Sequence, residues 1–374
     1  MKKYDLFKSV YQAIVKPVFF FIPPDNIHEF FLSFGNIAGK CICLRKLVEA
    51  LFSYQNNKLE QNIFGINFKN PVGLSEGYDK DAKLLNMLPS IGFGFTQIGT
   101  VTYEPYEGNP KPWLTRLKKS KAILVNYGLK NIGVFGIIKK LKGYKKIKIP
   151  YSVSVGKTNS CDTTNLDDGI ADYQNCYKAL IDENIGTFYT INISCPNTFG
   201  GEPFTTPEKL EKLLNVLMPM QSNKPVFLKM PINLPWEQFK TLLNVSVSNN
   251  VHGVIIGNLN KNYKDPNVMD ILPSNAKGGI SGLPTKELSN NLISETYKSH
   301  GKKLKIIGVG GIFTAEDAYD KIKKGASLVQ LITGLIYCGP QTVGAINSGL
   351  VMLLQKDGYN SIGDAVGKYH ELKK

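Results

Sequence analysis

The sequence lacks the patterns that mark metal, disulfide and dinucleotide-binding proteins. Its four histidines are isolated from one another and its six cysteines contain no C-x-x-C pair, so no metal site is indicated. Six cysteines in 374 residues do not make a disulfide scaffold, and a reducing compartment is expected. No G-x-G-x-x-G follows the first predicted strand, which argues against a Rossmann domain. The apolar stretch at residues 10–22 is interrupted and far shorter than the ~20 residues that span a bilayer.

The charge is one-sided but diffuse. Lys and Arg number 45 against 30 Asp and Glu, a net charge of +15, while 43% apolar and 20% charged residues are typical of a globular chain. Basic residues concentrate at 118–121, 139–148 and 302–305. A solvated lysine-rich surface is the favoured interpretation, and contact with anionic lipid is the second. Without a zinc-finger spacing, a basic-region helix or an RNA-binding aromatic box, no nucleic-acid partner is expected.

The first 55 residues differ from the rest. They predict two helices, Tyr4–Ile22 and Asn26–Phe52, separated by two prolines and rich in phenylalanine. Such amphipathic helices can lie on a membrane with lysines at the headgroups, or they can pack on the main domain as a cap. We therefore divide the chain into a helical extension, residues 1–55, and a main domain, residues 56–374.

The main domain alternates short apolar runs with amphipathic stretches. Alternation of this kind predicts a parallel sheet, and eight units predict a closed (β/α)8 TIM barrel, with an open doubly wound sheet as the alternative. The predicted strands are Asn70–Leu74, Phe95–Thr100, Tyr151–Val155, Phe188–Ile193, Val226–Met230, Gly253–Ile256, Lys305–Val309 and Leu328–Ile332. The predicted helices are Lys80–Leu88, Val134–Lys140, Gly169–Ile181, Pro207–Met218, Trp236–Ser248, Thr285–Lys298, Thr314–Lys323 and Pro340–Leu354.

The carboxyl ends of these strands carry amides, two lysines, a thiol and glycines, but no His–acid pair or paired carboxylates. Active sites of such barrels form at these ends, so hydrolytic chemistry is disfavoured. Gly308, Gly310 and Gly311 lie at the end of the seventh predicted strand, and Gly334 follows the eighth. They are either tight strand–helix turns or a phosphate site, which barrels often have at this place. Cys195 is either an inert buried thiol or a general base, if neighbouring cations such as Lys80 and Lys229 lower its ordinary pKa of ~8.5.

Taken together, these motifs resemble dihydroorotate dehydrogenase, the FMN enzyme of pyrimidine synthesis. The resemblance covers nearly the whole chain, and Pro24-Asp25-x-x-His28 resembles the helical extension of the membrane-associated, quinone-reducing class 2 enzymes. The matching segments are residues 70–74, 77–80, 92–95, 99–102, 108–110, 192–198, 279–282, 306–312, 325–331 and 339–340.

The resemblance implies roles for individual residues. Cys195 would be the base that takes the C5 proton of dihydroorotate, and Lys80, Asn192, Asn197 and Asn258 would bind this planar substrate. His28 and Arg116 would lie at the quinone site, and the extension would make the protein peripheral to a membrane, either the inner face of a plasma membrane or an organelle inner membrane. The implied FMN-binding residues are Gly77, Lys80, Thr100, Ser154, Asn192, Lys229, Gly282, Gly311, Ile332 and Thr333.

The sequence also departs from the family pattern. Class 2 enzymes have serine at the position of Cys195, and a substrate-binding asparagine aligns with Val125, one place before Asn126. A polar residue after Asn258 is replaced by Leu259. On the flavin side, Glu76 stands where a small residue is usual, Ser154 replaces asparagine, and Ile332 stands where tyrosine is common. Two alternatives therefore stay open: a flavin oxidoreductase with another substrate, and a flavin-binding homologue without turnover.

Overall fold

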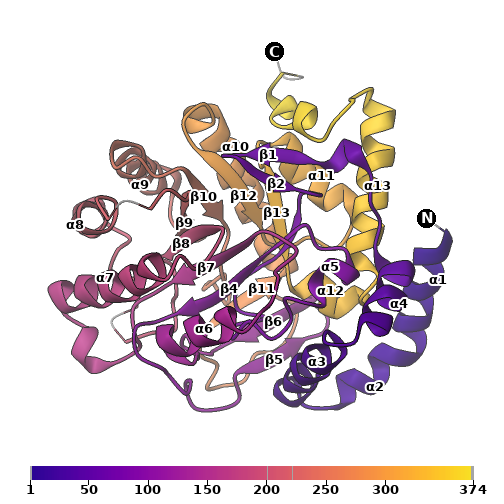
Figure 1. The fold of residues 1–374 in the computed structure, drawn as a ribbon, viewed down its shortest axis with the longest axis horizontal. Helices are drawn as coiled ribbons and strands as arrows, with labels where there is room; N and C mark the ends of the chain where they lie inside the picture. The colour runs from indigo at the N-terminus through magenta and orange to yellow at the C-terminus, as the bar shows by residue number, and fades with distance from the viewer. Residues whose placement is uncertain (1, 200, 221, 372–374) are drawn as a thin grey trace.

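The main domain is a closed barrel of eight parallel strands, seen in a computed structural model that describes residues 2–199, 201–220 and 222–371. The strands follow one another around the barrel in chain order (Figure 1), which confirms the TIM barrel and excludes the open sheet. All eight predicted strands are present. They are β3 (Val72–Leu74), β4 (Phe95–Val101), β7 (Tyr151–Val155), β8 (Phe188–Asn192), β9 (Val226–Met230), β10 (Gly253–Ile256), β12 (Lys305–Val309) and β13 (Leu328–Leu331).

Helices surround the barrel and bury one apolar face each against it. Their starts follow ordinary capping chemistry: the Asn165 side chain accepts from the N–H of Asp168, and Thr314 forms a capping box with Asp317. These helices are α6 (Gly133–Lys142), α7 (Leu166–Asp182), α8 (Pro207–Leu217), α9 (Trp236–Ser248), α10 (Lys286–His300), α11 (Ala315–Lys323) and α13 (Thr342–Asp357).

The helix predicted at Lys80–Leu88 is wrong. Turns occupy most of this segment, and only the short α5 (Leu88–Ile91) is helical. The buried Asp79 carboxylate accepts from the backbone N–H groups of Lys83 (2.7 Å) and Leu84 (2.8 Å). A side chain that satisfies these N–H groups holds the backbone in a turn and competes with the helix.

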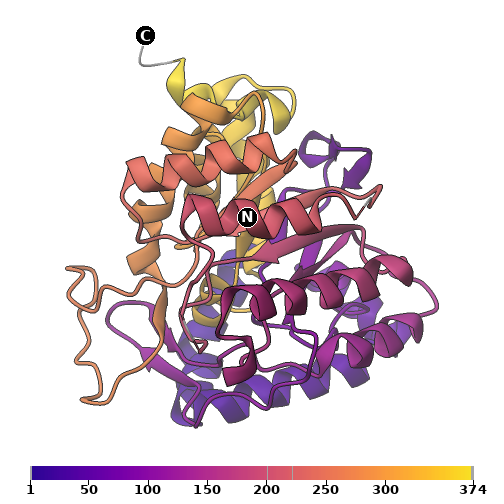
Figure 2. The same ribbon diagram turned by 90° about the vertical axis from the view of Figure 1, so that its left-hand side faces the viewer.

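A hairpin that the sequence analysis missed seals the amino-terminal end of the barrel. It consists of β1 (Gln61–Ile63) and β2 (Ile66–Phe68), and it lies opposite the N-terminal helices in Figure 2. Phe68 packs edge-on against Phe95 and contacts Phe188, the residues that begin two barrel strands. A second missed sheet of three antiparallel strands contains β5 (Leu114–Leu117), β6 (Ala122–Val125) and β11 (Gly279–Gly282).

The N-terminal helices pack along one side of the barrel, against β5 and α13 (Figure 1). They are α1 (Lys2–Val10), a π-helical turn (Tyr11–Val15), α2 (Lys16–Phe21), α3 (Pro24–Ala38) and α4 (Ile42–Phe52). The single helix predicted at Asn26–Phe52 is therefore two. The chain breaks at Gly39, a poor helix former whose added Cβ would lie 3.2 Å from Asn86, so the backbone approaches the barrel closely here.

Length and composition do not make any of these helices a membrane span. Among the described residues, no single helix is long and apolar enough to cross a bilayer. The helical segments Lys3–Phe21 and Pro24–Ala38 meet that requirement only as a pair, and the pair is bent by 114°.

Candidate active site

A cavity of about 470 Å³ lies between the N-terminal helices and the carboxyl ends of the barrel strands. The helices contribute an apolar wall that includes Phe7, Val15, Phe19, Phe20 and Phe31. The barrel contributes a polar wall. Most of the predicted site residues line this one space: His28, Gly77, Lys80, Thr100, Arg116, Asn192, Cys195, Asn197, Lys229, Asn258, Ile332 and Thr333.

A second cavity of about 90 Å³ continues from the first toward the glycine turns after β12 and β13. Gly282 and Gly311 line it, and Lys229, Ile332 and Thr333 line both cavities. Ser154 was also predicted to bind the cofactor, but it is not among the described residues that line either cavity. Its hydroxyl lies behind the cavity wall, 3.4 Å from the hydroxyl of Thr100. The remaining residues predicted for the cofactor therefore share one continuous surface.

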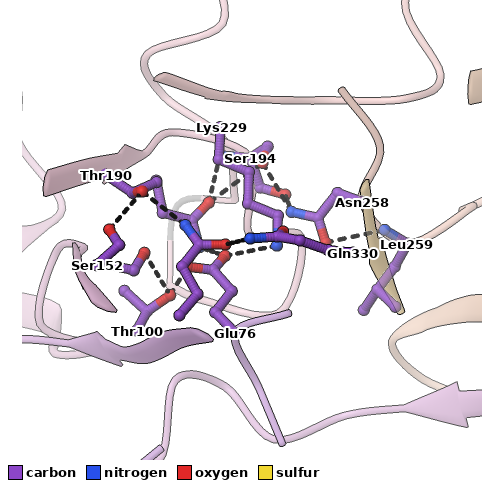
Figure 3. A network of polar contacts seen from close by, with 12 residues as sticks. Glu76, Thr100, Ser152, Thr190, Ser194, Lys229, Asn258, Leu259 and Gln330 are labelled. Carbon is purple, nitrogen blue, oxygen red and sulfur yellow. Dashed lines mark hydrogen bonds and ion pairs between the residues drawn. The ribbon is translucent and has the colours of Figure 1, made fainter. Parts of the chain in front are cut away.

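The most strongly charged feature of the polar wall is a buried ion pair between Glu76 and Lys229 (Figure 3). Glu76 follows β3 and Lys229 lies in β9. Their Oε1 and Nζ atoms are 2.7 Å apart, and each side chain is 5% exposed. Asn192 donates from Nδ2 to the same Oε1 (2.9 Å) and to the Thr100 hydroxyl (2.8 Å). The other carboxylate oxygen, Glu76 Oε2, is buried without a hydrogen-bond partner.

Polar side chains also connect the strands beneath this pair. Gln330 donates to Gln97 (2.8 Å), which donates to the Thr190 hydroxyl (2.6 Å), and Ser152 lies 2.9 Å from that hydroxyl (Figure 3). The sequence analysis did not single out these residues. A glutamine inside an otherwise apolar strand, as in Leu328–Leu331, was the available signal, because buried polar side chains in strands need partners.

The Cys195 thiol has a raised pKa, although Lys80 and Lys229 line the same cavity. Burial raises the pKa to about 12. A hydrogen bond from the Asn197 backbone opposes the rise, the charges of Glu76 and Glu202 add to it, and Lys229 opposes it weakly. Because Glu76 neutralises Lys229 at 2.7 Å, the expected cation does not act on the thiol alone.

The amides of the polar wall are already partly occupied. Asn258 Nδ2 donates to the carbonyl (2.8 Å) and hydroxyl (2.7 Å) of Ser194, and Asn197 Nδ2 donates to the Val125 carbonyl (3.0 Å). The Asn197 Oδ1 atom is buried without a partner. That oxygen can therefore accept an N–H from a ligand, whereas the wall around Val125 and Leu259 offers aliphatic side chains.

Asn126 does not replace the missing asparagine. It is not among the described residues that line the cavity, and its Oδ1 accepts from Asn109 Nδ2 (3.0 Å). Asn109 also donates to the Asn197 carbonyl (3.1 Å). Asn126 therefore supports the loop that carries Asn197 instead of contacting the cavity itself.

Lys80 and His28 meet at Tyr127, where the extension contacts the barrel. Lys80 Nζ lies 3.0 Å from the centroid of the Tyr127 ring, and burial lowers the pKa of this lysine to about 7. His28 contacts the Tyr127 hydroxyl (3.0 Å) through Nδ1 and the Tyr78 carbonyl (2.9 Å) through Nε2. Burial, aided by the charge of Lys80, lowers the pKa of His28 to about 4, which keeps this imidazole neutral at pH 7.

Arg116 joins the apolar wall of N-terminal helices to the three-stranded sheet that contains β5. From β5 it donates to the carbonyls of Ile22 (2.7 Å) and Phe19 (3.1 Å) at the end of α2, and its guanidinium lies 4.6 Å from the centroid of the Phe20 ring. A positive side chain at a helix carboxyl end satisfies carbonyls that the helix leaves free. Arg116 thus fixes the apolar wall in place over the cavity.

Polar side chains and glycine turns at the carboxyl ends of the strands form a site of the kind that TIM-barrel enzymes use, and here an apolar wall of helices faces it. The family profile named Dihydroorotate dehydrogenase matches residues 58–354. The chain belongs to the dihydroorotate dehydrogenase family, a family of flavin-dependent oxidoreductases.

Relatives of known name match nearly the full length. The chain is 39% identical to the dihydroorotate dehydrogenase (quinone) of Trichodesmium erythraeum over 334 residues, 87% of each chain. It is 36% identical to that of Christiangramia forsetii over 349 residues, 91% of this chain and 99% of the other. The crystal structure of the Eimeria tenella enzyme in complex with ferulenol is similar, with a TM-score of 0.81, 25% identity, and coverage of 93% of this chain and 96% of the other.

Proposed function

We propose that this protein oxidises dihydroorotate to orotate, with FMN as its cofactor and a quinone as electron acceptor, in pyrimidine biosynthesis. One observation carries the proposal: a single cavity is lined on one side by Lys80, Asn192, Cys195 and Asn197 and on the other by the phenylalanines of the N-terminal helices. A polar anion and an apolar ring compound could thus bind to opposite walls of the same cavity. In the overall reaction, dihydroorotate loses two electrons and two protons, and the quinone gains two electrons and two protons.

The residues present fit FMN. Gly77 has a φ of +96°, and a Cβ added there would meet nothing within 4 Å, so the cavity leaves open space above this turn. Gly282, Gly311 and Thr333 line the extension that would take the ribityl phosphate, since backbone N–H groups at glycine turns bind such anions. When bound, FMN supplies the two-electron acceptor for carbon C6 and passes the electrons on to the quinone.

The chain's own residues bind and deprotonate the substrate. Asn197 Oδ1, a buried acceptor without a partner, would accept a ring N–H. Lys80, when charged, would pair with the substrate carboxylate. Cys195 would take the proton at C5. Burial, with the charges of Glu76 and Glu202 added to it, opposes ionisation of this thiol, so the proton transfer requires a thiolate that is scarce at neutral pH.

The apolar wall of N-terminal helices would receive the quinone. Phe19, Phe20 and Phe31 offer apolar surface, while Arg116 and the neutral His28 supply polar groups at its inner end. The outer face of the same helices carries exposed apolar side chains, among them Phe21 (93% exposed) and Ile37 (70%). We propose that this face lies on a membrane, whether a plasma membrane or an organelle inner membrane, from which the quinone enters.

Anaerobic flavin reduction tests the proposed function. We expect purified protein to carry FMN, recognised by its visible spectrum, and added dihydroorotate to bleach it. A stable yellow protein would instead support a flavin oxidoreductase with another substrate, which the aliphatic side chains of Val125 and Leu259 favour. A colourless protein that does not take up FMN would support a homologue without turnover.

Liposome co-sedimentation tests the membrane site. We expect the full chain to sediment with vesicles that contain anionic lipid. A matched variant with Phe21→Ser and Ile37→Ser changes exposed side chains and leaves the core intact, so it should stay in the supernatant while its FMN spectrum is unchanged. Equal sedimentation of the two proteins would contradict the assignment.

A further inference from the structure

Glu76 lies at the junction of the two cavities, and the proposed mechanism gives its side chain no binding role. It lines both spaces, lies within 2.7 Å of Lys229, and keeps Oε2 buried without a partner. We propose that Glu76 Oε2 accepts the imide N–H (N3–H) of the bound flavin ring, while Lys229 donates to a carbonyl beside it. This inference rests on the proposed function, because it takes FMN to lie between the glycine turns and Asn192.

The buried orphan oxygen points to a ligand that donates a hydrogen bond. Buried carboxylate oxygens nearly always have a hydrogen-bond partner. Leaving a buried charged oxygen without a partner costs more free energy than leaving a buried neutral group without one. The two donors beside Glu76, Lys229 Nζ and Asn192 Nδ2, both go to Oε1. Because these donors meet the same oxygen, Oε2 is free to accept a hydrogen bond from a compound in the cavity that Glu76 lines.

The flavin pyrimidine edge presents the complementary pattern. It consists of a carbonyl, an N–H and a second carbonyl, so it offers one donor between two acceptors. Glu76 Oε2 supplies the acceptor, and the ammonium of Lys229 supplies a donor to a flanking carbonyl. The ribityl-phosphate end of the same compound would reach the glycine turns of the smaller cavity, which Glu76 and Lys229 also line.

The carboxylate also acts on the redox balance of the site. Negative charge that develops at this edge on reduction is stabilised by Lys229 and opposed by Glu76. Since the ion pair is nearly neutral as a whole, reduced FMN gains little from Lys229. The preference for oxidised over reduced FMN should therefore be stronger in the wild-type protein than in a variant without the carboxylate.

Binding of FMN and 3-methyl-FMN separates this contact from a merely structural role. The protein, stripped of cofactor, is titrated with each compound and followed by quenching of flavin fluorescence. The wild type should bind FMN about 10- to 100-fold more tightly than 3-methyl-FMN, which has no N3–H, as expected for a hydrogen bond to a charged group. Glu76→Ala removes the acceptor and makes room for the methyl group, so its two affinities should agree within about threefold.

Two further variants complete the design. Glu76→Gln keeps the shape without the charge, and its bound flavin should have a higher midpoint potential; each tenfold change in relative affinity for the two redox states corresponds to ~30 mV. Glu202→Gln removes a carboxylate that pairs with Lys261 at 3.0 Å. This control should change neither the ratio of the affinities for FMN and 3-methyl-FMN nor the midpoint potential of the bound flavin.

The outcomes distinguish this inference from the proposed function. Equal affinity of the wild type for FMN and 3-methyl-FMN overturns the contact and leaves FMN as the cofactor. FMN binding by Glu76→Ala but not by the wild type also overturns it, since Glu76 would then exclude the ring. Failure of every variant to bind FMN would overturn the cofactor assignment itself.

Discussion

The two walls of the large cavity are built by opposite means. The barrel wall is polar and internally bonded: Glu76, Lys229 and Asn192 form contacts of 2.7 and 2.9 Å within a closed sheet. The wall of N-terminal helices is apolar, and hydrogen bonds such as those of Arg116 attach it to the three-stranded sheet beside the barrel. Rigid polar geometry suits proton and electron transfer at defined atoms, whereas an apolar wall suits a compound recognised mainly by its ring. Changes to the two walls should therefore affect different half-reactions.

The largest effect is expected for Cys195→Ala. Loss of the proton acceptor should slow anaerobic bleaching by dihydroorotate about 10²- to 10⁴-fold without changing the FMN spectrum. In the wild type the bleaching rate should rise as pH increases from 7 toward 10, because a thiol with a pKa of about 12 forms more thiolate at each step. A mutant that bleaches at the wild-type rate would assign the proton to another group.

The next largest effect is expected for Lys229→Met. This change leaves the Glu76 carboxylate buried without its cation and should lower the free energy of unfolding by about 3–5 kcal/mol. Urea denaturation measures it, and the double variant Glu76→Gln/Lys229→Met should recover most of the loss. The control Lys69→Met breaks the pair with Glu60, whose side chains are both exposed, and should cost no more than about 1 kcal/mol.

Arg116→Ala should affect only the apolar wall of N-terminal helices, and therefore only the reaction with the quinone. Without its bonds to Ile22 and Phe19, the end of α2 loses its anchor, and kcat/KM for the quinone should fall about 10- to 100-fold. Bleaching by dihydroorotate should stay within about twofold of the wild type. Lys118→Ala, at an exposed position two residues away, is the control. If bleaching slowed as much as quinone reduction, the two walls would not be separable.

The smallest effect is a pH dependence of substrate binding. With its pKa lowered to about 7 by burial, Lys80 is charged below pH 7 and neutral above it, while the substrate carboxylate stays negative. The KM for dihydroorotate should therefore be lowest below pH 7 and rise by up to about tenfold per pH unit above it. Lys80→Met should have a high KM with no such rise. A wild-type KM that is constant from pH 6 to 9 would contradict the assignment.

The sequence predicted the parts of the fold that depend on local patterns. All eight strands and most helices followed from alternation of apolar runs, and the residues at the strand ends converged because a closed barrel brings those ends together. The hairpin β1–β2 was missed because two strands of three residues carry almost no periodic signal. The Lys80–Leu88 helix was mispredicted because the bonds of Asp79 to the backbone outweigh propensity.

Interactions across the barrel could not be predicted in the same way. Glu76 was recognised as unusual and Lys229 as a cofactor candidate, but nothing in their spacing shows that β3 and β9 place them 2.7 Å apart. The raised pKa of Cys195 follows from burial first and from the charge of Glu76 second, and the sequence alone shows neither. Local sequence patterns report which strand a residue ends, and the closed sheet decides which residue it faces.

The aromatic hairpin at the closed end of the barrel has a practical consequence. Its turn is exposed at Phe64 and Gly65, and an atom added to Gly65 would meet nothing within 4 Å. The hairpin lies at the end of the molecule opposite α2 and α3 (Figure 1). A fluorophore or surface tether attached through an engineered cysteine at the exposed Asn67 would thus report on the protein, or hold it on an electrode, with both cavity walls facing the solution.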